Sequence, residues 1–162
     1  GHAAAQYNLG YMYKNGEGVK PNSAQAAKWY RKAAFQGYAD AQNSLGVLYK
    51  KGDGVEQDPV QAVGWYAQAA AQGHMQAQLN LGIAFITGVG VNQDDSKAAE
   101  WFARAAEQGS DTAQYNLGVC YEKGRGVEQD TDEAIEWYER AAEQGNRKAQ
   151  AALERLEDYW DE

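Results

Sequence analysis

Cysteine, proline and histidine are scarce in this chain of 162 residues, which holds one Cys, two Pro and two His. A single cysteine cannot form an internal disulfide, and without a CxxC pair or a Cys/His cluster there is no candidate structural zinc site. Long hydrophobic runs are missing too, because no apolar segment approaches the ~20 residues that a membrane-spanning helix requires. We therefore expect no disulfide, no metal, no cofactor and no membrane partner.

Basic residues are in the minority, with 15 Lys and Arg against 23 Asp and Glu and a formal net charge of -8. A protein that binds the phosphate backbone of nucleic acid needs a basic surface that displaces counterions. Nucleic acid is therefore not an expected partner. The imbalance is uneven, because residues 1–72 hold seven basic and five acidic side chains, whereas residues 73–162 hold eight basic and eighteen acidic ones.

A targeting segment is not recognisable, since no charged and apolar leader precedes the first helix-like segment. Residues 1–2 are Gly1 and His2 rather than Met, and we interpret them as a cloning remnant or as the edge of an excised fragment. A native signal would be lost in either case. Composition alone therefore leaves the compartment unknown.

What the chain does contain is a repeat with an exact spacing of 36 residues. Each copy begins with Ala-Gln, followed by Leu-Gly and an aromatic residue four positions after the Leu. Gly-x-Gly-Val, a Trp-aromatic pair and Ala-Ala-x-Gln-Gly complete the copy. The Ala-Gln pairs start at Ala5, Ala41, Ala77, Ala113 and Ala149. A fixed period of this length is typical of a solenoid built from stacked units.

Each copy predicts two helices. Glycine adopts the left-handed C-cap conformation without steric cost, so the first helices are expected to end at Gly16, Gly52, Gly88 and Gly124, and the second at Gly37, Gly73, Gly109 and Gly145. The second helices have N-cap residues at Asn22, Asp58, Asp94 and Asp130. Pro59 occupies the first helical position after its cap, and Glu133, three residues after its cap, predicts a capping box.

The sequence thus predicts an all-α fold, an α/α solenoid superhelix of four 36-residue helix-pair repeats plus a C-terminal capping helix. The repeats occupy residues 3–148, at about 5–40, 41–76, 77–112 and 113–148, and a capping half-repeat occupies residues 149–162. In this last copy Glu154 and Glu157 replace the glycine and the aromatic residue of the other copies. Polar residues there suit an end that meets water.

These motifs together resemble the Sel-one-like repeat (SLR) family, relatives of tetratricopeptide repeats with a longer loop between the helices. The resemblance covers roughly residues 3–160. It implies an α-solenoid adaptor for protein complexes. Bacterial members are often exported and eukaryotic ones are often linked to endoplasmic-reticulum quality control, so a periplasmic or exported location is the expectation for a bacterial member. The family does not imply a particular partner.

Comparison of the four copies divides the first helix into two sides. The residues of one side are nearly constant, at the positions of Ala5, Gln6, Leu9, Gly10 and Tyr13, and we expect this side to pack against other helices. The other side changes from copy to copy, and we call it the variable face. It comprises the positions of Ala4, Tyr7, Asn8, Tyr11, Lys14 and Asn15 and their equivalents in the later copies.

Two rows of the variable face are mostly apolar or aromatic. One row holds Tyr7, Asn43, Leu79 and Tyr115, and the other holds Tyr11, Val47, Ile83 and Val119. In tetratricopeptide-like superhelices this side of the first helix lines the concave groove, and an exposed apolar strip usually marks a partner site. The alternative is that tight curvature packs both rows against the neighbouring repeat.

A third row of the variable face holds Asn8, Ser44, Asn80 and Asn116. Asparagine is a mediocre residue inside a helix, and its amide offers a donor and an acceptor that can pair with an extended peptide. Similar ladders line some tetratricopeptide grooves, and the resemblance extends this role to Asn8, Asn80 and Asn116. Alternatively, the row forms hydrogen bonds between repeats, and Ser44 interrupts a continuous track.

Lysines outnumber acidic residues on the variable face. Its lysines are Lys14, Lys50, Lys51 and Lys123, and its acidic residues are Asp40 and Glu122. Such a surface is able to hold an acidic segment or a C-terminal carboxylate. The alternative is that these lysines only keep the surface solvated.

Catalytic constellations are not evident. Gly-x-Gly follows a helix rather than a strand, which indicates a structural turn and not a nucleotide site. Cys120 shares its position with Met12, Leu48 and Ala84, so we interpret it as a buried apolar residue. His74 lies in an inter-repeat loop without an evident carboxylate or second ligand, and no Ser is followed three residues later by Lys. The repeat tryptophans, Trp29, Trp65, Trp101 and Trp137, have the spacing of packing residues between helices.

The function expected from the sequence is a non-catalytic adaptor that binds a peptide or protein segment, extended or acidic, in a concave groove lined by the first helices. The alternative is a structural spacer or a designed repeat scaffold without a natural ligand. The first repeat has no partner on its N-terminal face, so head-to-tail self-association belongs to this alternative. The exact register of the copies fits a regularised or designed protein as well as a natural one.

Overall fold

Nine helices follow one another in the computed structural model, which describes residues 1–160 and the side chains as far as Glu157. They are α1 (Ala3–Asn15), α2 (Ser23–Ala34), α3 (Ala39–Lys51), α4 (Pro59–Ala71), α5 (Met75–Thr87), α6 (Asp95–Glu107), α7 (Asp111–Lys123), α8 (Thr131–Glu143) and α9 (Arg147–Trp160). Within residues 1–160 there is no strand. The predicted all-α repeat fold with a terminal helix is therefore confirmed.

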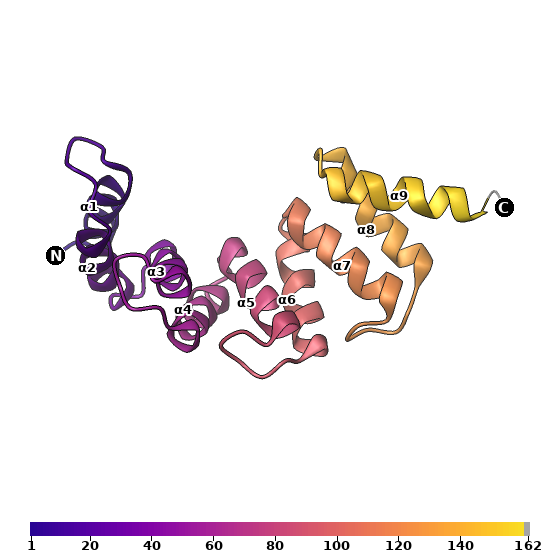
Figure 1. Ribbon diagram of the computed structural model, residues 1–162, viewed down its shortest axis with the longest axis horizontal. Coiled ribbons are helices and arrows are strands. Elements are labelled where there is room, and N and C mark those ends of the chain that lie inside the picture. Colours follow the sequence, from indigo (N-terminus) through magenta and orange to yellow (C-terminus); the bar gives the residue numbers. More distant parts are fainter. Residues whose placement is uncertain (161–162) are drawn as a thin grey trace.

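The helix pairs follow one another along an arc that opens toward the top of Figure 1, with α1 and α2 at its left end and α9 at its right end. Within a pair the two helices pack closely, as α1 does on α2 and α3 on α4. The second helix of each pair then packs on the first helix of the next pair, from α2 on α3 to α8 on α9. Packing mainly between chain neighbours is the defining property of a solenoid.

Helix boundaries agree with the glycine and N-cap signals. The first helices end at glycines with left-handed φ angles of 77°, 69°, 69° and 62°, at Gly16, Gly52, Gly88 and Gly124. The predicted N-caps of the second helices each accept a backbone N–H through a side-chain oxygen, at Asn22, Asp58, Asp94 and Asp130. These local contacts satisfy donors that would otherwise be left unpaired at a helix start.

The capping box predicted at Glu133 is wrong. The backbone N–H of Glu133 does donate to Asp130, but the Asp130 N–H donates to the Tyr121 carbonyl oxygen at 3.0 Å. That donor is therefore already satisfied by the end of α7. The same loop-closing bond recurs in every repeat, at Asn22 to Tyr13, Asp58 to Tyr49 and Asp94 to Phe85.

The constant side of the first helix is the packing side, as predicted. In α3, Ala41 and Leu45 have no exposed surface, and Gly46 is buried. A Cβ atom at Gly46 would lie 2.6 Å from the Tyr66 ring of α4. The Leu-Gly motif therefore exists because a large ring of the second helix lies directly on the first helix. The same contact pairs Gly10 with Tyr30, Gly82 with Phe102 and Gly118 with Tyr138.

The second glycine of each Gly-x-Gly motif joins one repeat to the one before it. At Gly90, a Cβ atom would collide with the Pro59 carbonyl of the preceding repeat. A Cβ atom at Gly54 or Gly126 would collide in the same way with the backbone of Ser23 or Asp95. The motif is thus a structural turn at a close backbone approach, as its repetition predicts.

The repeat tryptophans are only half-buried. Trp65, Trp101 and Trp137 pack against the core clusters, as predicted, but part of each ring stays accessible. A basic residue three positions later covers the ring in three repeats, with Lys32 Nζ 4.2 Å from the centroid of Trp29 and an Arg 4.4 Å from Trp101 and from Trp137. These cation–π contacts shield the outer surface of the second helices.

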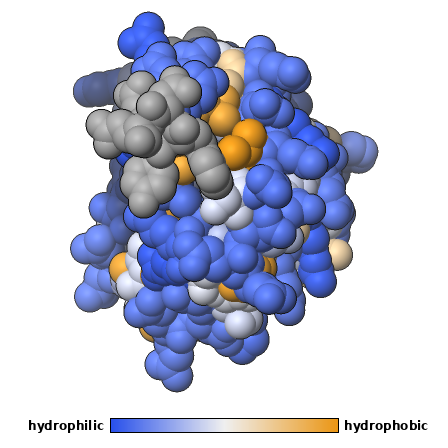
Figure 2. All heavy atoms as spheres, turned by 90° about the vertical axis from the view of Figure 1, so that its right-hand side faces the viewer, coloured by the Kyte–Doolittle hydropathy of each residue, from blue (hydrophilic) through white to orange (hydrophobic). Residues whose placement is uncertain are grey.

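The C-terminal end of the solenoid faces water. Glu154 and Glu157 are exposed on α9, and the view toward this end in Figure 2 is dominated by hydrophilic residues. Asp161 and Glu162, the last residues of the predicted cap, lie outside the described residues. Over residues 1–160, none of the helices combines the length and the apolar content needed to cross a membrane.

Candidate functional site

A row of three cavities lies along the variable face, at successive junctions between repeats. The first, of about 180 Å³, lies between α3, α4 and α5. The second, of about 410 Å³, lies between α5 and α7, and the third, of about 720 Å³, lies between α7, α8 and α9. Half of the predicted ligand-binding residues line these cavities: Lys50, Asn80, Ile83, Tyr115, Asn116, Val119 and Lys123.

The predicted residues of α1 lie outside this row. Tyr7 is half-buried between two rings, with its centroid 5.5 Å from Tyr30 and 5.3 Å from Tyr38. Asn8 is exposed, and Tyr11 retains 45% of its surface. Tyr11 is therefore the most accessible aromatic residue among those predicted.

The expected apolar strip is interrupted at Leu79, which is a correction to the sequence analysis. Leu79 is only 5% exposed and belongs to the core cluster of the third and fourth repeats. Tyr7 and Tyr115, in the same row, also turn toward the second helices of their own repeats, with ring centroids 5.5 Å from Tyr30 and 5.7 Å from Tyr138. Val47, in the other row, is half-buried against the core. The alternative of inter-helix packing therefore holds for Leu79, whereas Ile83 and Val119 remain half-buried at the cavities.

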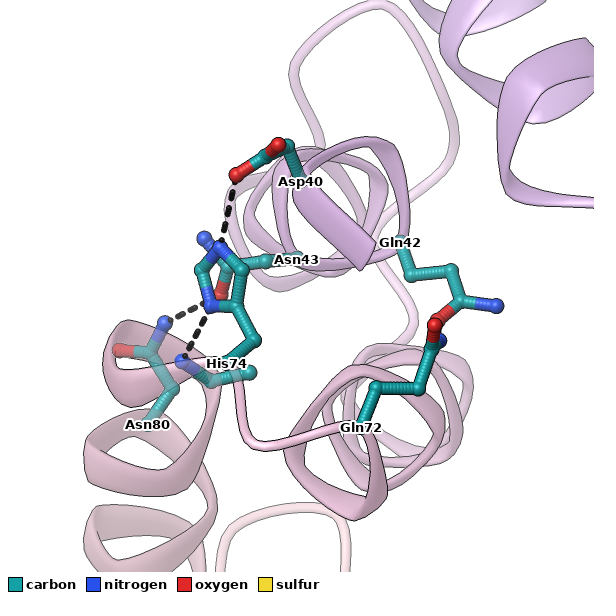
Figure 3. Close-up of polar contacts among 7 residues, drawn as sticks. Asp40, Gln42, Asn43, Gln72, His74 and Asn80 are labelled. Carbon is teal, nitrogen blue, oxygen red and sulfur yellow. Dashed lines mark hydrogen bonds and ion pairs between the residues drawn. The ribbon is translucent and has the colours of Figure 1, made fainter. Parts of the chain in front are cut away.

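The asparagine row is partly used to join repeats. The Asn80 side chain donates to Asn43 Oδ1 at 3.0 Å, which links α5 to α3 (Figure 3). Asn43 belongs to a different row, so this is a diagonal bond and not a ladder of equivalent positions. Asn116 is half-buried beside the second cavity. The amides of Asn8 and Asn116 thus remain the candidates for contact with a peptide.

The lysines of the variable face differ in their partners. Lys14 forms an ion pair with Asp53 of the next repeat, and this hydrogen bond, with a second from Ser23, lowers the pKa of the Asp53 carboxyl. Lys50 and Lys123 are exposed, and neither has an ion pair with any residue whose side chain the structure describes. These two ammonium groups are therefore available to a ligand, as is that of Lys148, an exposed lysine that lines the second and third cavities.

His74 has a carboxylate neighbour that the sequence did not reveal. Its Nε2 lies 3.1 Å from Asp40 Oδ1, across the junction between α3 and α5 (Figure 3). Its Nδ1 accepts the Ala77 N–H at 3.1 Å and so serves as the N-cap of α5. Both ring nitrogens are occupied by structural bonds, and we interpret His74 as a junction residue.

Buried glutamines form a second series of bonds across the junctions. Gln42 accepts from Gln72 at 2.7 Å (Figure 3) and donates to the Ala34 carbonyl of the preceding repeat at 3.2 Å. Gln78 and Gln114 make the equivalent bonds with Gln108 and Gln144. The signal was present in the sequence, since Gln recurs both after the first Ala and before the last Gly of each copy.

Among the side chains that the structure describes, one buried polar atom has no hydrogen-bond partner. The Tyr66 hydroxyl is enclosed without a hydrogen bond, Tyr66 is 2% exposed, and burial raises its pKa to about 12. Tyr66 also lines the first cavity. Buried polar groups are normally satisfied, so an exception beside a cavity is a candidate ligand contact.

The one cysteine lies in the core of the described part of the chain. Cys120 is 2% exposed, and burial raises the pKa of its thiol to about 11, so it is the apolar packing residue that the sequence predicted. Among the same residues, no group of three His, Cys, Asp or Glu side chains is placed to hold a metal ion.

Comparisons with known proteins agree with the repeat architecture. The model of the Sel1 repeat matches residues 3–38, 39–74, 76–110 and 111–146. No curated protein matches the chain. Among solved structures, c5321, a protective antigen of uropathogenic Escherichia coli strains with an SLR fold, is 46% identical with a TM-score of 0.92, over 94% of this chain and 33% of that one.

Two further structures share the fold. A Sel1 repeat protein from Oxalobacter formigenes is 41% identical with a TM-score of 0.89, over 94% of this chain and 63% of that one. Cysteine rich protein B of Helicobacter pylori is 24% identical with a TM-score of 0.58, over 68% of this chain and 86% of that one. The chain therefore spans less than two thirds of the length of the first two relatives.

Proposed function

The chain belongs to the Sel1 repeat family, and from that premise we propose that it is a non-catalytic adaptor that binds an extended peptide or protein segment along the variable face. Sel1 repeat proteins are generally scaffolds for protein–protein interaction. The observation that carries the proposal is the row of three cavities on one face of the solenoid. Successive hollows at repeat spacing suit successive side chains of an extended segment.

The chemistry along the row favours a segment with apolar and acidic side chains. Ile83 and Val119 offer half-buried apolar walls, and Lys50 and Lys123 offer cations without an intramolecular carboxylate among the described side chains. Asn116 adds an amide that can pair with a peptide group.

The test is a peptide-library pull-down with the wild-type chain and with a variant that carries Tyr11→Ala, Asn116→Ala and Lys123→Glu. These side chains are exposed or half-buried, so we expect the variant to keep its helical circular dichroism spectrum. A matched control carries Val60→Ala, Asn92→Ala and Lys28→Glu, which alter exposed residues outside the three cavities.

Peptides captured by the wild type and the control, but lost by the face variant, would support the proposal. Equal capture by all three proteins would move binding to another surface, and no capture by any of them would reject peptide binding by this solenoid.

A second candidate function is end-to-end association, and one observation favours it. Ala5 is exposed on α1, whereas its equivalents Ala41, Ala77 and Ala113 have no exposed surface because the preceding repeat covers them. Self-association through this end should appear as a rise in mass with concentration in light scattering, and Ala5→Arg should abolish that rise. A monomer at all concentrations would reject this candidate.

A further inference from the structure

The first cavity differs from its counterparts in the chemistry of its walls. It lies at the junction of the second and third repeats and has a volume of about 180 Å³. Its lining is mainly apolar, with Val63, Ile83 and Val89 among the contributors, and Lys50 and Tyr66 add polar groups. The repeat allows each of these residues to be compared with its equivalent at the other junctions.

The junction of the first and second repeats shows which partner a lysine at the position of Lys50 has. Lys14 is the equivalent of Lys50, and it pairs with Asp53, which reaches back from the loop of the next repeat. The residue equivalent to Asp53 at the following junction is Val89. Lys50 therefore lacks the carboxylate that its counterpart has.

At the junction of the third and fourth repeats, the loop residue is again charged and paired. Arg125 occupies the position of Asp53 and Val89 in the fourth repeat, and it forms two hydrogen bonds to Asp95 of the third repeat, at 3.0 Å and 3.1 Å. At both flanking junctions the loop residue is thus charged and paired with the preceding repeat. Val89 is the exception, and it is 47% exposed although it is apolar.

Tyr66, like Lys50, lacks the partner that its equivalent in another repeat has. Its equivalent in the fourth repeat, Tyr138, donates to Glu122 Oε2 at 2.7 Å. Glu122 occupies the position that Lys50 has in the second repeat, and a lysine cannot accept a hydrogen bond. The Tyr66 hydroxyl is therefore a buried donor without an acceptor.

We propose that the cavity between the second and third repeats holds the C-terminal residue of a peptide, whose free carboxylate meets Lys50 and the Tyr66 hydroxyl and whose apolar side chain lies against Ile83 and Val89. This proposal rests on the proposed function, because it assigns one end of the bound segment. The carboxylate takes the role that Asp53 has at the preceding junction. A carboxylate and an apolar side chain on one residue are the property of an apolar C-terminal residue, whereas an internal Asp or Glu brings no apolar group.

The cavity volume fits this occupant. An engineered protein cavity of about 150 Å³ admits a benzene molecule, so a cavity of about 180 Å³ has room for one apolar side chain. The opening lies on the variable face, next to Asn80 and Ile83, so the rest of the peptide is able to continue toward the second cavity.

The direct experiment measures fluorescence anisotropy with a set of labelled peptides that end in Leu, Val, Phe, Ser or Lys, each made as the free acid and as the C-terminal amide. We expect the free acids with apolar ends to bind at least ten times more tightly than their amides. Equal binding of acids and amides would overturn this inference and leave the proposed function intact. Binding by none of the peptides would reject both.

Three variants test the residues. Tyr66→Phe removes only the hydroxyl, and Phe102 shows that the fold accepts Phe at this position. We expect about fivefold weaker binding of the free acids with an unchanged or higher melting temperature, because the lost group has no bond in the free protein. Val89→Asp should pair with Lys50 and weaken the same peptides more than tenfold. Val60→Asp, an equal charge change at an exposed position outside the cavity, should leave the affinity unchanged.

Two further results would count against the assignment. Retained affinity in both Tyr66→Phe and Val89→Asp, with folded spectra, would place the carboxylate elsewhere. Isovalerate alone serves as a competitor of the Leu peptide, and if it bound as tightly as the peptide, the occupant would be a small carboxylic acid and the peptide assignment would be wrong.

Discussion

Gln72 donates its side-chain amide to Gln42 at 2.7 Å, while the Gln42 amide donates to the Ala34 carbonyl of the preceding repeat. One buried side chain thus bridges the second helices of two consecutive repeats. Both its donor and its acceptor are used, which is the condition under which a buried amide is tolerated. The bond to Ala34 fixes how one repeat sits on the next.

Replacement of Gln42 should therefore lower stability more than replacement of its terminal equivalent. We expect Gln42→Ala to reduce the free energy of unfolding by about 1–3 kcal/mol, because it removes two buried hydrogen bonds. Gln150→Ala changes the same position in the exposed terminal helix and should cost less than about 0.5 kcal/mol. Urea denaturation of the two variants measures the difference, and equal costs would contradict the bridging role.

Two glycines within helices should respond to alanine in opposite directions. Gly46→Ala places a Cβ atom 2.6 Å from the Tyr66 ring and should destabilise the protein by about 1–3 kcal/mol through overpacking. Gly64→Ala meets nothing within 4 Å and should stabilise the protein by about 0.5–1 kcal/mol, because alanine is the better helix former. Thermal unfolding of both variants tests the pair, and a stabilising Gly46→Ala would show that the close packing of α3 on α4 is not required.

Truncation of Leu81 should open a cavity in the core. Leu81 is 2% exposed, so Leu81→Ala should lower the free energy of unfolding by about 2–5 kcal/mol. Val60→Ala, at a side chain that is 68% exposed, should change it by less than about 0.5 kcal/mol. Denaturant unfolding followed by circular dichroism compares them, and similar midpoints would refute the placement of Leu81 in the core.

Acid should weaken the solenoid through its N-cap carboxylates. Hydrogen bonds from the Gln61 backbone and side chain lower the pKa of Asp58, and bonds from Lys97 lower that of Asp94. Because the folded pKa lies below the unfolded value of about 3.9, this stabilisation is present above about pH 4 and is lost as the pH falls through the folded pKa.

Asp58→Asn keeps a side-chain oxygen for the cap but removes the titration. We expect its urea midpoint to fall less between pH 5 and pH 2 than that of the wild type. Glu128→Gln, which makes a comparable change at an exposed loop residue, is the control and should follow the wild-type slope. A variant curve that also follows the wild type would exclude Asp58 as a source of the acid sensitivity.

The repeat order, the helix ends and the packing side were predictable because each depends on residues close together in the sequence. A glycine C-cap or an Asp N-cap acts within one helical turn, and four copies of each signal remove chance matches. The capping box at Glu133 failed because the carbonyl of Tyr121, nine residues back in α7, already accepts the hydrogen bond of the Asp130 N–H.

The environment of the individual side chains on the variable face was only partly predictable. Ile83, Asn116 and Val119 do line cavities, but Leu79 is buried and Asn80 is bonded to Asn43. Which way a side chain turns depends on the second helix of its own repeat, as for Tyr115 and Tyr138, or on the adjacent repeat, as for Asn80 and Asn43. The helical wheel of one helix does not contain that information. The exception at Val89 was visible among equivalent positions, yet its meaning required the ion pair of Lys14 with Asp53.

Packing between chain neighbours has a consequence for how such a molecule changes over generations. Each helix rests mainly on the helix before it and the helix after it, so the loss or duplication of one 36-residue unit in the middle leaves two compatible surfaces to meet again. Length is then a trait that can vary by whole units without redesign of a common core. Each added unit also brings another junction between repeats. A single substitution in its loop, such as valine for aspartate, is enough to remove the ion pair that joins that loop to the preceding repeat.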